Sequence, residues 1–445
     1  MTATIVNTIK NSFKEYTVLS KSIYILFLVR VVNSLGTLIF PFLTLFLTEK
    51  LMLNEKTAGM YVTIASTAFA PGAIIGGKLS DQIGRKKTYI IFQSAAGLCM
   101  AMCIFLKNSL LIPWILIFAA LFVAGAQPAN SAMIADITQK SNRKTGFSII
   151  FLGNNLGIGL GGILAGFLFQ NNTSLLFVIC TIAMIITNIL LALFVRETLP
   201  DINTSENSNN LSRQETDSKL SGEAIRNEYS EVDITEKSDV NKKESFFKVL
   251  IKKPVLLIFC VACVLFSLIY SQYNFSIPLQ TKLLFGEKGA WVFGSIIMIT
   301  NTLTIIILTF FVTAFSAKKK TLTNLILAGA FFAVGFGMIG MIKSILLLII
   351  STVLWSIGEI LYTTNSVVYI ADNAPSTHRG RFNSFYTIIS GSGHAIGPAV
   401  TGIVIDRSGI EIVWPVVFGL SILSMFFMYG ISLFENRLRR VSKHN

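Results

Sequence analysis

Long uninterrupted apolar segments are the feature that most constrains how this chain can fold. A helix needs roughly 20 apolar residues to cross the hydrocarbon core of a bilayer. The segments are continuous rather than alternating in polarity, and only helices or closed barrels satisfy their backbone in lipid. The sequence therefore predicts an all-α integral membrane protein with twelve transmembrane helices. The predicted segments are residues 22–48, 57–79, 88–106, 110–137, 145–170, 174–195, 254–281, 289–316, 321–342, 344–371, 381–405 and 411–434.

The overall composition agrees with a membrane protein. Hydrophobic residues make up 53% of the chain and charged residues 13%, whereas soluble domains carry about 25% charged residues. The mean hydropathy is +0.66. Lysines precede the first apolar segment without a cleavage-site pattern, so we expect this segment to be retained rather than removed as a signal peptide.

The distribution of basic residues predicts the orientation of the helices. If the N-terminus lies inside, the short inside segments hold nineteen Lys and Arg residues and the outside loops hold seven. The positive-inside bias then places both termini in the cytoplasm, which is consistent with an even number of spans. We expect a multi-pass protein of the cell (plasma or inner) membrane. The same bias accounts for the formal net charge of +14, and no basic arm with interleaved aromatic residues argues for nucleic acid.

Residues 196–247 differ in composition from the rest of the chain. They contain 12 of its 23 acidic residues and few large apolar side chains. Such a segment cannot bury enough surface to fold alone, so we expect a flexible cytoplasmic linker. The linker would separate an N-terminal six-helix bundle, residues 1–195, from a C-terminal six-helix bundle, residues 248–445.

The two halves of the chain are related by an internal repeat. A shift of 236 residues places Ala135-Asp136 on Ala371-Asp372, and in both copies an arginine follows the aspartate by seven residues. A shift of 237 residues places Pro41 on Pro278. These identities predict two bundles related by a parallel pseudo-repeat, with a substrate site near the midplane between them.

A charged turn lies between the second and third predicted segments. Residues 77–87 read Gly-x-x-x-Asp-x-x-Gly-Arg-Lys-Lys and carry four cations and one carboxylate, which places them in a water-facing loop. The pattern resembles the loop 2–3 signature of the major facilitator superfamily of secondary transporters, with Gln82 where the family has arginine.

Further motifs resemble one branch of that superfamily, the drug:proton antiporters or multidrug exporters. The glycines of span five are similar to the antiporter motif Gly-x-x-x-Gly-Pro-x-x-Gly-Gly, with Ile158 in place of proline, and span eleven keeps Gly397-Pro398. Residues 371–380, Ala-Asp-x-Ala-Pro-x-x-x-Arg-Gly, and Gly358-Glu359 in span ten are also like this branch. The resemblance implies export of lipophilic, often cationic compounds in exchange for protons by alternating access.

The sequence predicts a transporter without enzymatic activity, cofactor or metal. No phosphate-binding P-loop is present, so we do not expect ATP to be the energy source. The five cysteines all lie in predicted spans. We interpret Cys260-x-x-Cys263 as apolar packing rather than a redox or metal pair, because no histidine or acid lies nearby.

Three ionisable residues deep in predicted spans are the proton-coupling candidates, because such residues are costly in lipid. Glu359 lies in the middle of span ten, where desolvation disfavours its charge, so it could alternately hold a proton and a cationic substrate. Arg30 in span one could hold a substrate anion, pair with a carboxylate or extend to the cytoplasmic surface. His394 in span eleven could titrate with Glu359 or serve as a neutral packing residue.

Other polar and aromatic side chains form two further groups of candidates. Aromatic surfaces with a few polar groups suit a pocket for amphipathic ligands. The substrate-binding candidates are Asn33, Thr37, Gln127, Asn130, Asn154, Tyr270, Tyr273, Asn274, Trp355 and Tyr362. The conformational-gate candidates at the cytoplasmic surface are Gly77, Asp81, Gly84, Arg85, Asp136, Arg143, Asp372 and Arg379.

Two alternative functions remain open on the sequence alone. One is a metabolite transporter of the same fold, for which Arg30 would bind an anion. The other is a transporter-derived sensor or interaction protein that uses residues 196–247 to contact partners. We expect the partners to be a small-molecule substrate, protons and the lipid bilayer, and the chain to act as a monomer.

Overall fold

The fold is helical throughout the part of the chain that the structure describes. A computed structural model describes residues 19–106, 109–139, 142–199, 254–374 and 379–441. Ten continuous helical runs in these residues are long and apolar enough to cross a membrane. One of them, Pro254–Ser316, contains two predicted segments, and the first predicted segment is interrupted at residues 37–42. Each of the twelve predicted segments therefore corresponds to helix, and the predicted fold class is confirmed.

The helices run in the same order in both halves. Short π-helical turns, Phe46–Lys50 and Val292–Met298, extend α3 and join α14 to α15. The N-terminal helices are α2 (Lys21–Gly36), α3 (Leu43–Leu45), α4 (Glu55–Thr67), α5 (Phe69–Ile83), α6 (Arg85–Phe105), α7 (Ile112–Ile137), α8 (Arg143–Asn171) and α9 (Thr173–Phe194). The C-terminal helices are α12 (Pro254–Ser271), α13 (Ser276–Phe285), α14 (Gly289–Trp291), α15 (Ile299–Ser316), α16 (Thr321–Gly337), α17 (Ile345–Asn373), α18 (Arg379–Ser408) and α19 (Val413–Val441).

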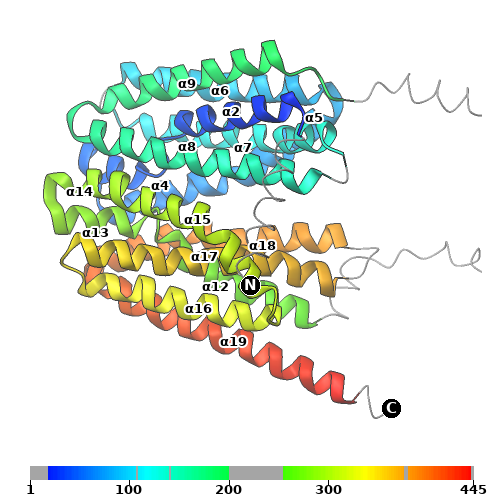
Figure 1. Ribbon diagram of the computed structural model, residues 1–445. Coiled ribbons are helices and arrows are strands. Elements are labelled where there is room, and N and C mark those ends of the chain that lie inside the picture. Colours follow the sequence, from blue (N-terminus) through cyan, green and yellow to red (C-terminus); the bar gives the residue numbers. More distant parts are fainter. Residues whose placement is uncertain (1–18, 107–108, 140–141, 200–253, 375–378, 442–445) are drawn as a thin grey trace, which may run out of the picture.

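The two halves pack in the same way, which confirms the pseudo-repeat. In the first half α2 packs against α8 and α9, and in the second α12 packs against α18 and α19. Likewise α6 packs against α7 and α9, as α16 packs against α17 and α19. Figure 1 shows the resulting two bundles one above the other, with the N-terminal bundle in blue to green and the C-terminal bundle in green to red.

The two bundles meet at one end and separate toward the other (Figure 1). The diverging end carries Asp81 and Arg85 and is called the predicted cytoplasmic end; the opposite end is the predicted outer end. Where they meet, α4 packs against α18, and α8 packs against Val292–Met298 and α15. The contact is close, because a Cβ added at Gly59 would lie 2.3 Å from the carbonyl oxygen of Pro398. The two halves are therefore in close contact at the predicted outer end.

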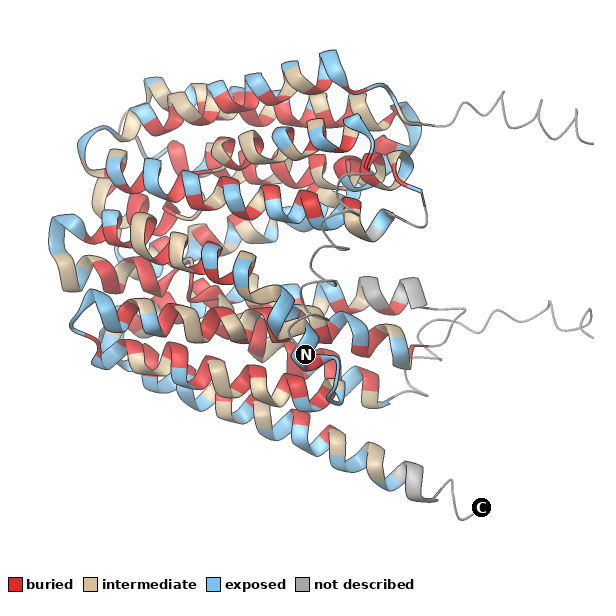
Figure 2. Cartoon of the chain, in the orientation of Figure 1, coloured by how far each residue is buried: buried red, intermediate tan, exposed pale blue. Residues whose placement is uncertain are grey.

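The outer surface of the bundles is strongly apolar. Residues such as Ile74, Leu193 and Phe426 expose 70%, 72% and 67% of their surface. Figure 2 shows exposed residues along the outward faces of the helices and buried residues between them. Apolar exposure on this scale fits a chain whose solvent is lipid rather than water.

The first segment of each half is broken at matching positions. Turns occupy residues 37–42 between α2 and α3, and residues 272–275 between α12 and α13. Pro41 lies in the first break, and Pro278, which the repeat aligns with it, lies in the first turn of α13; a residue without a backbone N–H is tolerated at both positions. The hydroxyl of Thr44 donates to the backbone carbonyl of Asn274 at 2.9 Å. The two breaks therefore adjoin each other at the interface between the halves.

Candidate functional site

Glu359 lies midway along α17, fourteen residues from either end of Ile345–Asn373. At 1.5 Å per residue this is about 21 Å from each end of the helix. The hydroxyl of Tyr270 donates to Oε1 at 2.8 Å, and Nδ2 of Asn301 donates to Oε2 at 3.0 Å. Both partners are neutral, and no cation pairs with Glu359 in the described ranges. The site therefore stabilises an ionised carboxylate by hydrogen bonds without neutralising its charge.

Asn301 was not among the residues predicted from the sequence. It is buried on α15, and its Nδ2 also donates to the hydroxyl of Ser356 at 2.9 Å. An amide in the middle of an apolar span is itself a signal, because polar groups in lipid need partners. The same argument that selected Glu359 could therefore have found Asn301.

Aromatic rings surround the Tyr270–Glu359 contact. The ring centroids of Tyr270 and Tyr273 lie 6.0 Å apart, and those of Tyr273 and Trp355 lie 5.1 Å apart. The Tyr273 hydroxyl and Trp355 Nε1 are buried and have no hydrogen-bond partner in the described part of the chain. Such groups are usually satisfied in a working protein by water or a ligand. The structure thus brings together a carboxylate, an aromatic wall and free polar groups.

His394 and Tyr362, two further candidates, lie beside this group. The His394 ring is 6.2 Å from that of Tyr270, so the histidine contacts the phenol that holds Glu359. Tyr362 shares a hydrogen bond of 3.2 Å with Ser267 and stacks on Phe266 with ring centroids 4.9 Å apart. It therefore belongs to the packing of α12 against α17.

Arg30 and Gln127 meet between α2 and α7 in the N-terminal half. The guanidinium Nη1 donates to Gln127 Oε1 at 3.1 Å. Arg30 lies nine residues after the start of α2 and Gln127 ten residues before the end of α7, so both are about 14 Å from the predicted cytoplasmic end. The Arg30 side chain therefore reaches a neighbouring helix within the bundle. In this conformation it does not extend to the cytoplasmic surface, which was one of the alternatives predicted from the sequence.

A chain of polar contacts leads from this region to Glu359. Ser34, one turn after Arg30, donates to Asn154 Oδ1 at 3.3 Å. The next residue, Asn155, accepts from the hydroxyl of Thr302 at 3.3 Å through its backbone carbonyl. Thr302 follows Asn301, which holds Glu359. The α8–α15 contact thus connects the two candidate regions across the interface between the halves.

The remaining substrate-binding candidates occupy varied positions. Thr37 donates to the backbone carbonyl of Ser34 at 3.1 Å, so its hydroxyl is already bonded. Asn33 and Asn130 are buried on α2 and α7. Asn274 lies at the helix break before α13.

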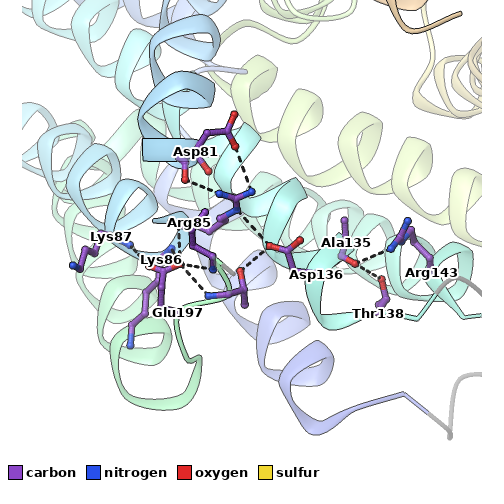
Figure 3. Close-up of polar contacts among 12 residues, drawn as sticks. Asp81, Arg85, Lys86, Lys87, Ala135, Asp136, Thr138, Arg143 and Glu197 are labelled. Carbon is purple, nitrogen blue, oxygen red and sulfur yellow. Dashed lines mark hydrogen bonds and ion pairs between the residues drawn. The ribbon is translucent and has the colours of Figure 1, made fainter. Parts of the chain in front are cut away.

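Charged residues cluster at the predicted cytoplasmic end of the N-terminal half. Arg85 forms ion pairs with Asp81 at 3.3 Å and with Asp136 at 3.4 Å, and its Nη1 donates to the backbone carbonyl of Ser80 at 3.0 Å. Figure 3 shows Arg85 between the two carboxylates, which come from α5 and α7. The structure therefore brings together three of the predicted gate residues, with the Arg85 cation between the two carboxylates.

Glu197, which the sequence predicted to lie in the linker, completes this cluster (Figure 3). Its carboxylate accepts hydrogen bonds from the backbone N–H groups of Arg85, at 2.7 Å, and Lys86, at 3.3 Å. Partial burial acts to raise the pKa of Glu197, but the backbone N–H groups that donate to it outweigh this and lower the pKa below its usual value of 4.5. A carboxylate at a helix N-terminus also interacts favourably with the helix dipole.

Gly84 leaves space for the Glu197 carboxylate at the N-terminus of α6. It has a φ of +111°, which favours glycine, and a Cβ there would lie 2.4 Å from Glu197 Oε2. The Thr198 hydroxyl donates to Asp136 at 3.1 Å, so the segment after α9 contacts both α6 and α7. Little in the sequence indicated this role. Glu197 comes just after span six, and it looked like one more acidic residue of the linker that follows.

We expect Glu197→Gln to lower the thermal unfolding midpoint of the detergent-solubilised protein. Loss of a capping carboxylate costs about 1 kcal/mol. Because the pKa of Glu197 is lower in the folded protein, its contribution is fully present above pH 4.5 and is lost as pH falls further. The difference between wild type and variant should therefore be constant from neutral pH to about pH 5 and shrink in stronger acid. A difference that grows in acid contradicts this account.

The other gate candidates lie around the same end of the molecule. Gly77 faces Pro128. A Cβ added at Gly77 would lie 3.7 Å from the Cβ of Pro128. Arg143 Nη2 donates to the backbone carbonyl of Ala135 at 3.2 Å. Asp372 is exposed near the end of α17, and Arg379 begins α18, with its side chain outside the described residues.

A third ion pair, not predicted from the sequence, joins the halves at the predicted outer end. Lys282 Nζ on α13 lies 2.8 Å from Glu49 Oε2, and the Glu49 side chain is only 12% exposed. Gln170 on α8 also donates to Glu49, at 3.4 Å. Because Glu49 and Lys282 belong to different halves, separation of the halves at this end must break the pair.

Comparison with known proteins agrees with this architecture. The sequence pattern of the Major Facilitator Superfamily matches residues 26–398 and 325–444. The chain is 22% identical over 396 residues to the uncharacterized MFS-type transporter YqjV of Bacillus subtilis, covering 87% of this chain and 88% of the relative. It is 22% identical over 388 residues to a Na(+), Li(+), K(+)/H(+) antiporter of Planococcus maritimus, covering 82% and 85%.

A solved structure shows the same fold. A POT family transporter in complex with a thioalcohol conjugated peptide superposes with a TM-score of 0.72 at 15% identity, covering 94% of this chain and 96% of that one. No group of three or more metal-ligating side chains occurs in the described ranges. With two similarly packed helical bundles and a family match over most of its length, the chain belongs to the major facilitator superfamily of membrane transporters.

Proposed function

We propose that this protein is a proton-coupled antiporter of the drug:proton branch, which exports lipophilic, cationic small molecules by alternating access. The observation that carries the proposal is Glu359. It is held in the middle of a spanning helix by Tyr270 and Asn301, and no cation among the described residues pairs with it. An uncompensated charge is costly in a low-dielectric environment. Either a proton or the positive group of a substrate can remove that cost, so the two compete for one carboxylate.

The surroundings of Glu359 support an organic cation as the competitor. Three aromatic rings lie close together, with centroids 5.1–6.4 Å apart: those of Tyr270, Tyr273 and Trp355. Aromatic faces attract organic cations, and this attraction strengthens when water is excluded. A relative of the chain, the Planococcus maritimus antiporter, is named for exchange of cations against protons.

The closed predicted outer end supports the alternating-access part of the proposal. The Glu49–Lys282 pair and the glycine contacts between α4 and α18 and between α8 and Val292–Met298 hold the halves together there. The charge cluster around Arg85 lies at the opposite end, which we propose faces the cytoplasm together with both termini. Export then requires the halves to separate at the predicted outer end, and the Glu49–Lys282 pair to break, once per cycle.

Transport of ethidium in reconstituted vesicles tests the proposal. Vesicles with an acidic lumen should accumulate this lipophilic cation against its gradient when they contain the protein. Addition of nigericin, which collapses the pH gradient, should release it. Protein-free vesicles provide the control. Uptake that persists unchanged after the gradient is collapsed, or that never exceeds the control, contradicts proton-driven antiport.

A second candidate function rests on Arg30. A metabolite transporter of the same fold would use this guanidinium to hold an anionic substrate, and Arg30 has no carboxylate partner among the described residues. The sensor alternative rests on residues 196–247, of which 200–247 lie outside the described residues, so it stays a prediction.

A further inference from the structure

We propose that the N-terminal half contains an anion-binding subsite built around Arg30, and that the preferred substrates are amphoteric. Their acidic group would lie at Arg30 while their cationic group lies at Glu359. This inference rests on the proposed function, in which Glu359 binds the substrate cation, and it adds a substrate class that this function alone does not require.

Hydrogen-bond donors gather around Arg30. A guanidinium has five N–H donors, and one of those on Arg30 donates a hydrogen bond to Gln127. Asn33, one turn later on the same face of α2, is 4% exposed, and its Nδ2 has no hydrogen-bond partner in the described residues. Unsatisfied buried donors of this kind call for an acceptor.

Helix α6 adds two more groups. The buried phenol of Tyr89 is close enough to Arg30 to interact with it electrostatically. Gln93, one turn after Tyr89, is 1% exposed and its Nε2 also lacks a partner within the described ranges. Three helices thus contribute a positive charge and amide donors to one region, and the matching ligand chemistry is a carboxylate.

No protein carboxylate fills this role in the described part of the N-terminal half. Glu49 and Glu55 lie at the predicted outer end, and Asp81, Asp136 and Glu197 lie at the predicted cytoplasmic end. Arg30 is therefore a half-buried cation within a spanning helix, and the described part of its own bundle supplies no counter-charge. Since an uncompensated charge removed from water is costly, an anionic group of the transported molecule is the natural partner.

The Arg30 and Glu359 regions adjoin the same contact between the halves. Ser34 beside Arg30 bonds Asn154, while Thr302 beside Asn301 bonds the carbonyl of Asn155. A Cβ added at Gly159, one turn further along α8, would lie 3.0 Å from Thr302, so α8 and α15 pack tightly here. A molecule that lies beside this contact would present its anionic end to the first half and its cationic end to the second.

Two forms of one dye test the subsite. Tetramethylrhodamine methyl ester is a cation, and tetramethylrhodamine carboxylic acid has the same ring system with a free carboxylate. Fluorescence anisotropy with the purified full-length protein should give a higher affinity for the acid than for the ester. Arg30→Gln should weaken binding of the acid by about tenfold and change binding of the ester by less than about twofold. Arg30→Lys, which keeps the charge, should recover part of the loss.

The ester is an internal control for folding, because a variant that still binds it has an intact cation site. Equal affinities of wild type for the two dyes, absent binding of the acid, or an equal loss for both dyes in Arg30→Gln each overturn the subsite. The measurement uses no pH gradient. Failure of proton coupling in the ethidium experiment therefore leaves this result unaffected, and the two proposals fail independently.

Discussion

Replacing Glu359 with glutamine is expected to abolish proton-driven uphill transport. Glutamine keeps the size of the side chain and can accept from Tyr270, but it carries no charge and releases no proton. Loss of the attraction between this half-buried carboxylate in the middle of a spanning helix and the substrate cation is worth about 3 kcal/mol, which corresponds to about 100-fold in affinity. Accumulation of ethidium in vesicles with an acidic lumen should fall to the level of protein-free vesicles.

Glu411→Gln is the matched control for this substitution. Glu411 is exposed in the short helix Ile410–Ile412, far along the chain from the aromatic wall, and the same chemical change there should leave transport near the wild-type rate. The thermal unfolding midpoint of Glu359→Gln should fall only modestly, because the amide oxygen still accepts from Tyr270 while the amide nitrogen cannot accept from Asn301, and one lost hydrogen bond costs about 1 kcal/mol. Wild-type accumulation by a folded Glu359→Gln protein would falsify the coupling role.

Replacing Gly294 with valine is expected to stop transport by preventing closure of the predicted outer end. A Cβ at this position would lie 2.2 Å from the backbone oxygen of Gly162 and 2.8 Å from the Phe42 ring. The obstacle includes backbone from the opposite half, so it cannot be removed by rotating a side chain. Overpacking of this kind costs about 1–3 kcal/mol where the structure can relax, and here relaxation means separating the halves. We expect the transport rate to fall by at least about tenfold.

Gly419→Val provides the same substitution without the obstacle. Nothing lies within 4 Å of a Cβ added to Gly419 in α19, so this variant should transport at about the wild-type rate. Both variants should insert into the membrane, because Gly294 contacts the other half rather than the interior of its own bundle. Equal rates for the two variants would show that the glycine contact is not part of the seal.

Properties that depend on local sequence could be predicted. Each apolar run became helical, with a break in the first segment of each half, because length and hydropathy largely decide whether a helix suits lipid. The repeat was visible because Ala135-Asp136 and Ala371-Asp372 recur at one offset, and the equivalent packing of α2 and α12 follows from it. Glu359 was found because a carboxylate in the middle of an apolar run is conspicuous without any knowledge of its neighbours.

Properties that depend on contacts between distant residues could not be predicted. The sequence offered His394 and Arg30 as groups that could act with Glu359, whereas the contacts of its carboxylate come from Tyr270 and Asn301 on two other helices. Which helix faces place a hydroxyl or amide within 3 Å depends on rotation and tilt, which hydropathy does not determine. Glu197 was missed for the same reason, since its role depends on the N-terminus of α6, more than a hundred residues earlier.

The presence of a single carboxylate deep in the spanning helices of the described chain affects which part of the proton-motive force can drive transport. A monovalent cation that leaves in exchange for one proton moves no net charge, so the membrane potential does no work on that cycle. An amphoteric molecule is neutral overall, and its exchange for one proton carries one positive charge inward. Each such cycle gains about 2.3 kcal/mol per 100 mV of potential. On this reasoning, the acidic group of a substrate makes its export electrogenic, and an energised cell would expel amphoteric molecules more strongly than simple cations.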